Sequence, residues 1–517
     1  MRRFAARLAV ALALATPAPV AAQSVTIALG ADIRSSNPGV NRDDATDGVM
    51  LHVVEGLVGY REDGSVGPLL ARAIEVSPDG RTYTFRLRQG VRFHNGAPMT
   101  AEDVVWSWRR YLDPKTAWWC IATFDGRNGP KVEAVEAVEA PDPATVVMRL
   151  AQPNPLFLTF MAQTDCAQGA VLHRDSVNAN GSWKEPIGTG PFRLAEWRRG
   201  ELVHLSRFAE YASPEGGKRD GYVGRKEATI EEVRFLVVPD LGTVKAALTR
   251  GTIDIANVPE SEAQEFADTP RTRVVATPVA VRRGFLLQTQ DPLLSDVRIR
   301  RAIAMSLDID ELVAATSSGF SKPNASAIHP QSPYWSEVQA RRFPHDPARA
   351  RALLKEAGYR GQRIVISTDR RPTVPTYNMA VIAQAMMAAV GFDVGVEVVE
   401  WGTSMDRYNT GRFQMLSFSY SSRMDPALAY EQFSGPKART PRKVWDDPEV
   451  ERMIAESAMA TDKAERQRIF DALHLRMLDS VPLIPLYNGV DVRAVNKRID
   501  GFAPWEFKPR FWGVTAR

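Results

Sequence analysis

The sequence predicts an α/β protein with mixed sheets, built from at least two lobes. Segments with the period of two that is typical of half-buried strands alternate with segments that have helical spacing and capping residues. Proline and glycine separate these segments. Removal of an N-terminal segment, residues 1–22, leaves 495 of the 517 residues. Because a single hydrophobic core stops growing beyond about 250–300 residues, this length requires more than one lobe.

The first clear strand and helix lie between residues 78 and 111. Residues 78–80 (PDG) predict a turn, and apolar residues then alternate with polar ones over residues 82–88, which predicts a half-buried strand. Thr100 begins a helix, since Asp103 follows at the spacing of a capping box. The apolar face of this helix contains Val104, Trp108 and Tyr111.

Similar signals continue to the end of the chain. A strand, a helix from about Thr243 and a second strand are expected over residues 230–256, with Gly251 ending the helix. Asp308 and Glu311 have the spacing of a helix N-terminus. The last helix follows Thr461, and a short apolar strand is expected around Pro482 and Pro485. The last helix repeats Ile469, Leu473 and Met477 at four-residue intervals.

The N-terminal segment predicts export. Three arginines among residues 2–7 precede an apolar run at residues 8–15, and residues 20–22 (VAA) are small. This order predicts a signal peptide cleaved after Ala22. The run is too short to span a bilayer, which takes roughly 20 residues. Since Gln23 follows, where a lipid-anchored protein has cysteine, we expect a periplasmic protein without a lipid anchor.

Composition and charge exclude a nucleic-acid-binding protein. The chain is 44% hydrophobic and 24% charged, as in ordinary globular proteins. Its net charge of +4 includes the three arginines of the signal and no acidic residue from it, which leaves about +1. Basic runs such as residues 298–301 are interrupted by apolar residues at helical spacing.

Two cysteines occur, Cys120 and Cys166. An isolated pair in an exported protein favours a disulfide over two buried free thiols, the alternative that the sequence leaves open.

Signatures of catalysis and of cofactor binding are missing. There is no nucleophile elbow, phosphate-binding loop or zinc-protease motif, and the sequence GTG at residues 188–190 lacks the third glycine of a dinucleotide loop. The seven histidines lack metal-ligand spacing. We expect no enzyme, no metal and no cofactor, although a hydrolase site assembled from distant residues stays open.

The whole mature chain resembles the extracellular solute-binding proteins of the dipeptide/oligopeptide/nickel class, family 5, which serve ABC importers. No single segment is diagnostic, and the resemblance depends on the order and spacing of several. These are residues 52–58 (HVVEGLV), 68–71 (PLLA) with the strand at 82–88, 91–96 (VRFHNG), 100–104 (TAEDV), 188–192 (GTGPF), 247–255 (ALTRGTIDI), 296–303 (DVRIRRAI) and 485–487 (PLY).

The resemblance implies a two-lobed periplasmic binding protein fold with mixed sheets and a hinge between the lobes. The first lobe would contain residues 23–275, including an extra subdomain at about 46–185 that holds both cysteines. The second lobe would contain residues 276–484, and residues 485–517 would return to the first lobe.

The same resemblance implies a mechanism and partners. A peptide or peptide-like solute, such as an opine-like or other carboxylate-bearing molecule, would bind between the lobes and favour the closed form. The partners would be this small molecule and the ABC permease subunits of the inner membrane, with the protein acting as a monomer. The alternatives are a nickel-chelate or sugar binder on the same fold, or a chaperone-like protein of the cell envelope.

Two loops carry the first candidate ligand-binding residues. Ser35 and Asn37 lie in the loop after the first strand, which lies at the cleft in relatives, and an ordinary polar turn is the alternative. In the second loop, peptide-binding relatives carry an acidic residue that holds the α-amino group, and the matching place here is Ser422, or Ser421 with a small shift. The sequence therefore does not predict recognition of a free α-amino group. Arg423 could bind a carboxylate with both nitrogens or could pair with Asp425. Tyr420 begins this loop.

The remaining candidates are aromatic or amide side chains. Trp118, Trp119 and Trp401 are large enough to line a pocket, with core packing as the alternative. Gln288 stands where relatives often have asparagine at the crossover between lobes.

Overall fold

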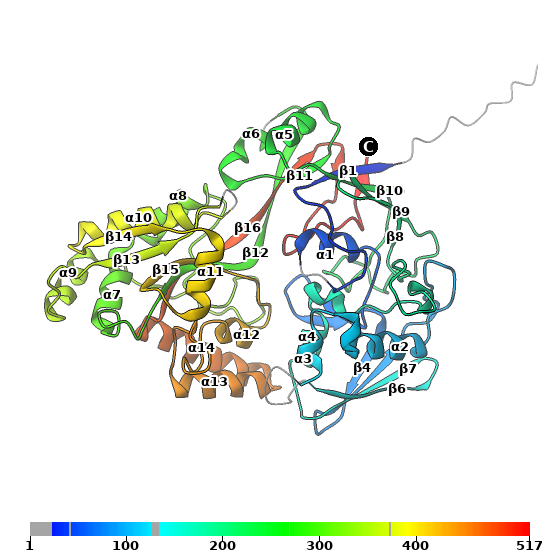
Figure 1. The fold of residues 1–517 in the computed structure, drawn as a ribbon, viewed down its shortest axis with the longest axis horizontal. Coiled ribbons are helices and arrows are strands. Elements are labelled where there is room, and N and C mark those ends of the chain that lie inside the picture. The colour runs from blue at the N-terminus through cyan, green and yellow to red at the C-terminus, as the bar shows by residue number, and fades with distance from the viewer. Residues whose placement is uncertain (1–22, 41–42, 127–133, 268, 372–373) are drawn as a thin grey trace, which may run out of the picture.

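The computed structural model describes residues 23–40, 43–126, 134–267, 269–371 and 374–517, so the expected signal peptide lies outside the described residues. The chain forms two lobes, with the N-terminal and C-terminal segments together in one of them (Figure 1). Helices and strands alternate in both lobes, and the predicted α/β class with mixed sheets is confirmed.

One ten-stranded sheet runs through both lobes. Its strand order is β14-β13-β15-β12-β16-β11-β1-β10-β9-β8. The strands in this order are β14 Val394–Val398, β13 Ile364–Thr368, β15 Met415–Tyr420, β12 Thr272–Leu287, β16 Leu483–Asn496, β11 Ile255–Asn257, β1 Ser24–Leu29, β10 Glu232–Val237, β9 Leu202–Arg207 and β8 Phe192–Arg198.

The long antiparallel strands β12 and β16 connect the lobes (Figure 1). In the first lobe, Thr272 to Pro278 pair with Asn496 to Val490. The register then shifts between Pro278 and Arg282, and the second-lobe halves pair from Arg282 onward, where β12 also contacts β15. The register shifts again between Arg283 and Gly284, so this irregular stretch between the two halves is the point at which the pair can bend.

The part of the first lobe between α1 Asp44–Met50 and β8 forms a separate unit with its own sheet, ordered β4-β5-β7-β6. Helix α2 packs on this sheet, and buried aromatic rings fill the space beneath it. The elements are β2 Val58–Tyr60, β3 Val66–Pro68, β4 Ala71–Val76, β5 Thr82–Leu87, α2 Ala101–Leu112, α3 Ile121–Phe124, β6 Val135–Asp142, β7 Thr145–Leu150 and α4 Phe157–Met161.

The second lobe carries helices on both faces of β13, β14 and β15 (Figure 1). Helices α7, α8, α9 and α10 share one buried cluster, and α12, α13 and α14 share another. Their bounds are α7 Val297–Ser306, α8 Ile309–Thr316, α9 Pro347–Glu356, α10 Thr376–Ala389, α11 Trp401–Thr410, α12 Pro426–Glu431, α13 Pro448–Met459 and α14 Lys463–Ser480. In the first lobe, α5 Leu241–Arg250 and α6 Gln264–Ala267 cover β11.

The local predictions agree with these elements in most places. Thr100 caps α2, with its backbone N–H 2.9 Å from an Asp103 carboxylate oxygen, as the capping-box spacing predicts. Gly251 ends α5 at φ 79°, a left-handed conformation that favours glycine. The last helix, α14, follows Thr461 as expected, with Asp462 as its capping residue. One prediction was wrong: the short strand expected near Pro485 is the 14-residue β16.

The C-terminal segment after β16 folds back onto the first lobe. Strands β17 Ile499–Asp500 and β18 Thr515–Ala516 pair with each other, and the loop between them packs on β2 and β3. The fully buried Arg510 makes two hydrogen bonds, of 2.7 and 2.9 Å, to the Glu62 carboxylate in the β2–β3 turn. This bidentate pair fixes the loop at residues 501–514 on the first lobe.

Cys120 and Cys166 are joined by a disulfide with a Cα–Cα distance of 5.7 Å. The two cysteines are 46 positions apart in the sequence. They lie inside the first-lobe unit, next to the ring of Trp118.

Replacement of both cysteines by serine should lower the free energy of unfolding by about 2–4 kcal/mol, because the unfolded chain regains the freedom that the cross-link removes. Urea unfolding monitored by circular dichroism measures this change. A reducing agent should destabilise the wild type to a similar extent and leave the double variant unaffected. Equal stability of the two proteins would contradict the expected contribution.

Candidate functional site: the cleft between the lobes

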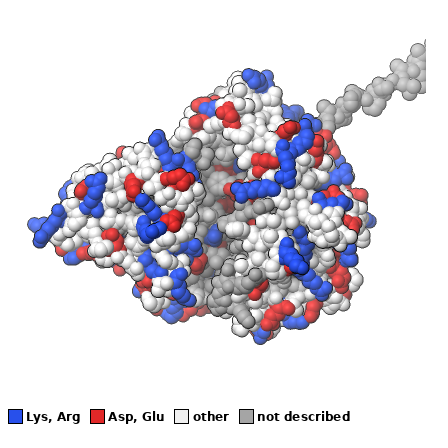
Figure 2. Space-filling view, viewed as in Figure 1, with Lys and Arg blue, Asp and Glu red and all other residues white. Residues whose placement is uncertain are grey.

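The second-lobe wall of the cleft forms where three strands end. β13 runs parallel to both β14 and β15, so their carboxyl ends lie at the same edge of the sheet. Ligands of open α/β sheets bind at this edge. Asp369, Trp401 and the loop after Tyr420 follow these three strand ends. The surface is hollowed along the boundary between the two lobes (Figure 2).

Trp401 begins α11 and keeps 37% of its surface exposed. The Arg371 guanidinium lies 3.7 Å from the centre of its ring and also pairs with the Asp369 carboxylate at 2.5 Å. Cation–π contact and ion pair together hold an exposed aromatic face at the strand ends. Of the three tryptophan candidates, Trp401 is thus placed where a ligand could contact it.

The loop after β15 contains both structural and free side chains. Tyr420 is buried, with the Arg282 guanidinium 5.1 Å from its ring centre. Asp425 caps α12 and makes two hydrogen bonds, of 2.8 and 2.9 Å, to Arg466. Asp425 is therefore occupied by a partner in its own lobe, and the alternative of an Arg423–Asp425 pair is wrong.

Arg423 is left without a carboxylate partner among the described residues. Its guanidinium donates one hydrogen bond, of 2.8 Å, to the backbone oxygen of Ser422. Other cations lie near it: Arg282 bonds only to oxygens of neutral groups, and Arg442 lies over the ring of Tyr408. This part of the wall is therefore positively charged and suits an anionic group.

Ser422 contacts the first lobe. Its hydroxyl donates a hydrogen bond to the carboxylate of Glu506, which lies in the C-terminal loop. The other Glu506 oxygen accepts a 2.8 Å hydrogen bond from the backbone N–H of Ala280, in the irregular part of β12. Burial raises the pKa of Glu506 to about 7, while the Ser422 and Ala280 hydrogen bonds and Lys508 lower it and Asp491 raises it.

The floor beside Glu506 is aromatic. Tyr60 and Trp505 stack with ring centres 5.4 Å apart, and both are almost fully buried. Burial raises the pKa of Tyr60, and the charges of Asp165, Asp425, Arg423 and Glu506 also act on its phenol. Tyr60 therefore lies among charged groups of both lobes.

The lobes also touch beside this floor. Met424 packs against the buried cluster of the first-lobe unit, and Leu156 of that unit is buried in the cluster of α12, α13 and α14. A Cβ atom on Gly64 would lie 3.0 Å from the Met424 sulfur, so a larger residue at this turn would obstruct the contact.

This cluster does not include the expected ligand-binding residues Trp118, Asn37 and Ser35. Trp118 is 1% exposed and packs on Tyr111 and Phe124, so it is a core residue, whereas neighbouring Trp119 is 56% exposed. Asn37 is buried and accepts a hydrogen bond from Arg110 at 3.2 Å, and the Ser35 hydroxyl accepts one from the Asn37 backbone, as in a polar turn.

Gln288 was expected at the crossover between lobes, but it lies at the opposite end of the second lobe. β12 pairs antiparallel with β15, so Gln288 lies beside the start of β15, with its N–H 2.9 Å from the Gln414 oxygen. Six residues of extended chain, roughly 20 Å, separate it from the crossover near Arg282. Its side chain instead lines a shallow cavity of about 470 Å³ with Asp291 and Lys437.

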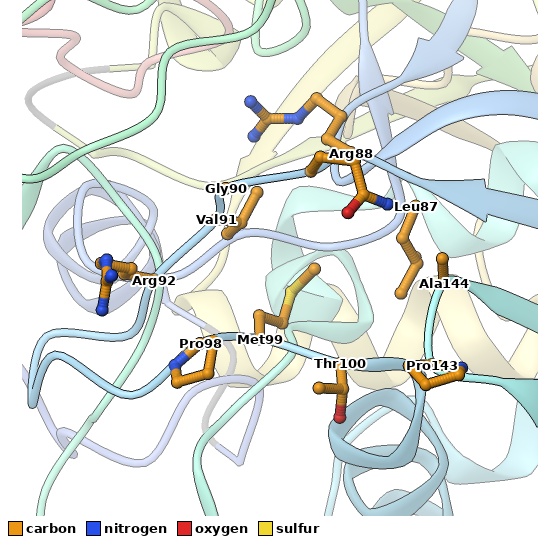
Figure 3. A pocket seen from close by; sticks show the side chains of 11 residues that line it. Leu87, Arg88, Gly90, Val91, Arg92, Pro98, Met99, Thr100, Pro143 and Ala144 are labelled. Atoms are coloured by element: carbon orange, nitrogen blue, oxygen red, sulfur yellow. The ribbon is translucent and has the colours of Figure 1, made fainter.

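A second small cavity, of about 270 Å³, lies within the first-lobe unit (Figure 3). Leu87, Val91 and Met99 line it, and no second-lobe residue does. Arg88, also at its edge, bonds to the backbone oxygens of Leu69 and Ala212. The Arg88 guanidinium is already hydrogen-bonded, and only one lobe lines the cavity. It is therefore a poor candidate for a ligand site that closes between the two lobes.

In the described part of the chain, no group of three or more His, Cys, Asp or Glu side chains could hold a metal ion. Nor does any helix there combine the length and the apolarity needed to cross a membrane.

Sequence reasoning missed Glu506, Tyr60 and Trp505. Tyr60 lies two residues beyond the segment at residues 52–58 that carries the family resemblance, so extension of that segment by two residues would have included it. Glu506 lies between two aromatic residues in a loop without periodicity, and only the return of the C-terminal segment brings it to the cleft.

Comparisons with known proteins agree with this architecture. Residues 65–440 match the family described as "Bacterial extracellular solute-binding proteins, family 5 Middle". The "Probable di/tripeptide-binding protein 5" of Pseudomonas aeruginosa is 28% identical, covering 95% of this chain and 94% of its own length. The "Glutathione-binding protein GsiB" of Salmonella typhi is 25% identical, covering 97% and 96%.

A solved structure shows the same fold. The binding protein AgaA of A. tumefaciens R10, in complex with agropinic acid, is 25% identical with a TM-score of 0.71, covering 96% of this chain and 99% of that one. The two-lobed fold expected from the sequence is confirmed by this likeness.

Replacement of Glu506 by glutamine should flatten the dependence of stability on pH. A native pKa near 7, above the unfolded value of 4.5, means that the native state holds an extra proton between these values. The stabilisation that comes from protonation of Glu506 in the native state is therefore fully present below pH 4.5 and is lost as the pH rises through 7.

Between pH 5 and pH 8, the wild type should lose on the order of 1–3 kcal/mol relative to Glu506→Gln in urea unfolding. The comparison removes the effect of other groups that titrate in this range, because both proteins share them. Parallel pH profiles would contradict the raised pKa.

Proposed function

The chain belongs to the bacterial extracellular solute-binding proteins of family 5, and from this membership we propose that it captures a peptide or peptide-like, carboxylate-bearing solute for an ABC importer. The relatives named above are binding proteins for di- and tripeptides, glutathione and an opine. Binding rather than catalysis is the proposed role.

The observation that carries this proposal is Arg423, which has no carboxylate partner in the described part of the chain and lies in the loop that reaches the first lobe. A buried or half-buried guanidinium without a carboxylate favours an anionic ligand group, which can bind it through two parallel hydrogen bonds. Arg282 and Arg442 add positive potential, whereas the nearby Lys443 is already paired with Glu431 at 2.5 Å. The solute's carboxylate would lie against Arg423, with the exposed ring of Trp401 on the same wall.

Hinge bending supplies the mechanism. A solute that contacts the strand ends of the second lobe and the first-lobe side of the cleft binds both lobes only when they are close together. It therefore stabilises the closed form, and moving an equilibrium from 1:99 to 99:1 takes about 5.5 kcal/mol of differential affinity. Bending at residues 278–282 of β12 allows this motion without unpairing either regular half.

We further propose that the protein acts as a periplasmic monomer without a lipid anchor and delivers the solute to permease subunits in the inner membrane. The signal-peptide pattern of residues 1–22 and Gln23 at the expected cleavage site support this location. We also propose the lobes expected from the sequence, 23–275, 276–484 and 485–517, as the units that move, with each boundary shifted by a few residues to the bend at residues 278–282 of β12 and 488–490 of β16.

Screening the mature protein by thermal shift should identify carboxylate-bearing di- and tripeptides, glutathione or opines as stabilising solutes. Arg423→Gln should weaken binding of such a solute at least tenfold in calorimetric titration, because the bidentate contact is lost. Arg412→Gln is a matched control, since Arg412 is 70% exposed and pairs with Asp406.

Several results would contradict the proposal. Stabilisation only by nickel chelates or by sugars would assign a different ligand class. Stabilisation by no small solute, together with capture of unfolded polypeptide, would indicate a chaperone-like protein. Equal affinity of Arg423→Gln and wild type would exclude Arg423 as the carboxylate site.

A further inference from the structure

We infer that Glu506 is a specificity-determining residue that binds an ammonium group of the solute from the first lobe, opposite the carboxylate site at Arg423. The inference rests on the proposed function and narrows the solute to molecules that carry both a cationic nitrogen and a carboxylate. Four features of the structure support it.

The first feature is the lack of a cationic partner. The Glu506 carboxylate accepts hydrogen bonds only from a hydroxyl and a backbone N–H, and no cation of the described residues lies within ion-pair distance of it. Burial of a carboxylate without a countercharge is costly, and a native protein compensates for it or uses it in binding. A bound ammonium would provide the missing charge.

The second feature is that the neighbouring cations are occupied elsewhere. Lys508 makes a 2.9 Å ion pair with Asp44 and contacts only the backbone oxygen of Glu506, at 3.4 Å. Arg493 pairs with Asp491 at 2.7 Å and bonds to the backbone oxygen of Phe507. The loop thus has two cations within reach, and both are held away from the Glu506 carboxylate.

The third feature is the backbone of the loop. Trp505 and Lys508 exchange two backbone hydrogen bonds of 2.9 Å, and the two residues between them, Glu506 and Phe507, have φ values of 47° and 65°. Positive φ at both central positions is the pattern of type I′ turns, which favour asparagine and glycine. A glutamate and a phenylalanine there are strained, and such strain concentrates at functional sites.

The fourth feature is the position of the carboxylate between the moving parts. One oxygen is bonded to Ala280 at the bend of β12, and the other is bonded to Ser422 in the second lobe, directly before Arg423 in the chain. An ammonium at Glu506 and a carboxylate at Arg423 would therefore join the two lobes through one solute. The arrangement selects solutes whose opposite charges are close together, as in a short peptide or an amino-acid derivative.

The test uses dipeptides of the form Ala-Xaa and glutathione, each paired with its N-acetylated derivative, which keeps the carboxylates and loses the ammonium. Affinities for the mature wild type, Glu506→Gln and Glu210→Gln are measured by calorimetric titration. Glu210→Gln is the matched control, because Glu210 is 61% exposed and lies outside the cleft. Comparing the affinity of the wild type for each solute and for its N-acetylated derivative tests the inference directly, and this comparison does not depend on the folding of any variant.

N-acetylation should weaken binding to the wild type at least tenfold, and Glu506→Gln should weaken binding of the unmodified solutes by a similar factor. Glu506→Gln should also bind both members of each pair with nearly equal affinity, while Glu210→Gln should behave like the wild type. At pH 6, binding of an ammonium solute should release protons from the wild type and not from Glu506→Gln, which titration in buffers of different ionisation enthalpy measures. A merely structural role of Glu506 would not produce this difference.

Two kinds of failure are distinguishable. If neither the free nor the acetylated solutes bind the wild type, the proposed function fails and the inference fails with it. If solutes bind but acetylation leaves the affinity unchanged, or if Glu506→Gln still discriminates between the two members of a pair, the inference is overturned and the proposed function stands.

Discussion

The antiparallel pairing of β12 with β16 is the constraint on which the two-lobed structure depends. Each strand belongs to both lobes, so the sheet of either lobe is complete only when both strands are in place. The register shifts between Pro278 and Arg282 and between Arg283 and Gly284 separate the first-lobe half of the pair from the second-lobe half and place the bend beside the cleft. A solute-binding protein needs this combination, because the lobes must stay in register while the angle between them changes.

The charge distribution in the cleft follows from where each element ends. Parallel β13, β14 and β15 direct their carboxyl ends to one edge, which brings Trp401 and the loop with Arg423 together. The C-terminal segment crosses back to the first lobe and is fixed there by the buried Arg510–Glu62 pair, which positions Glu506 on the opposite side. One wall is therefore rich in guanidinium groups, and the other presents the carboxyl group of Glu506, which has no cationic partner among the described residues.

Much of the fold could be predicted from the sequence, and less of the site. The strand at residues 82–87, the capped helix after Thr100 and the unit ending at Gly251 have local signals, and these signals agree with the structure because each element buries one face. The length of β16 had no such signal, since a strand covered on both faces lacks alternation and proline interrupts the pattern. Trp118 shows a related limit: a large aromatic side chain is equally suited to a core or a ligand, and only packing distinguishes the two.

The feature hardest to predict was which residues form ion pairs and hydrogen bonds with the charged side chains of the cleft. Asp425 lies two residues from Arg423 in sequence, yet it pairs with Arg466, 41 residues away, which leaves Arg423 free. The Glu506 carboxylate is bonded to residues 84 and 226 positions distant in the sequence. Long-range geometry of this kind is absent from a single sequence, because spacing along the chain does not determine distance in space.

The central position of β16 has a further consequence for biogenesis. This strand lies between β12 and β11 in the middle of the ten-stranded sheet but is among the last segments to be synthesised. Neither lobe can close its sheet on a nascent chain that lacks residues 483–496, so the order of synthesis itself delays folding. A chain whose central sheet stays incomplete until its last segment is made is more easily threaded through a membrane pore, which suits the proposed export route.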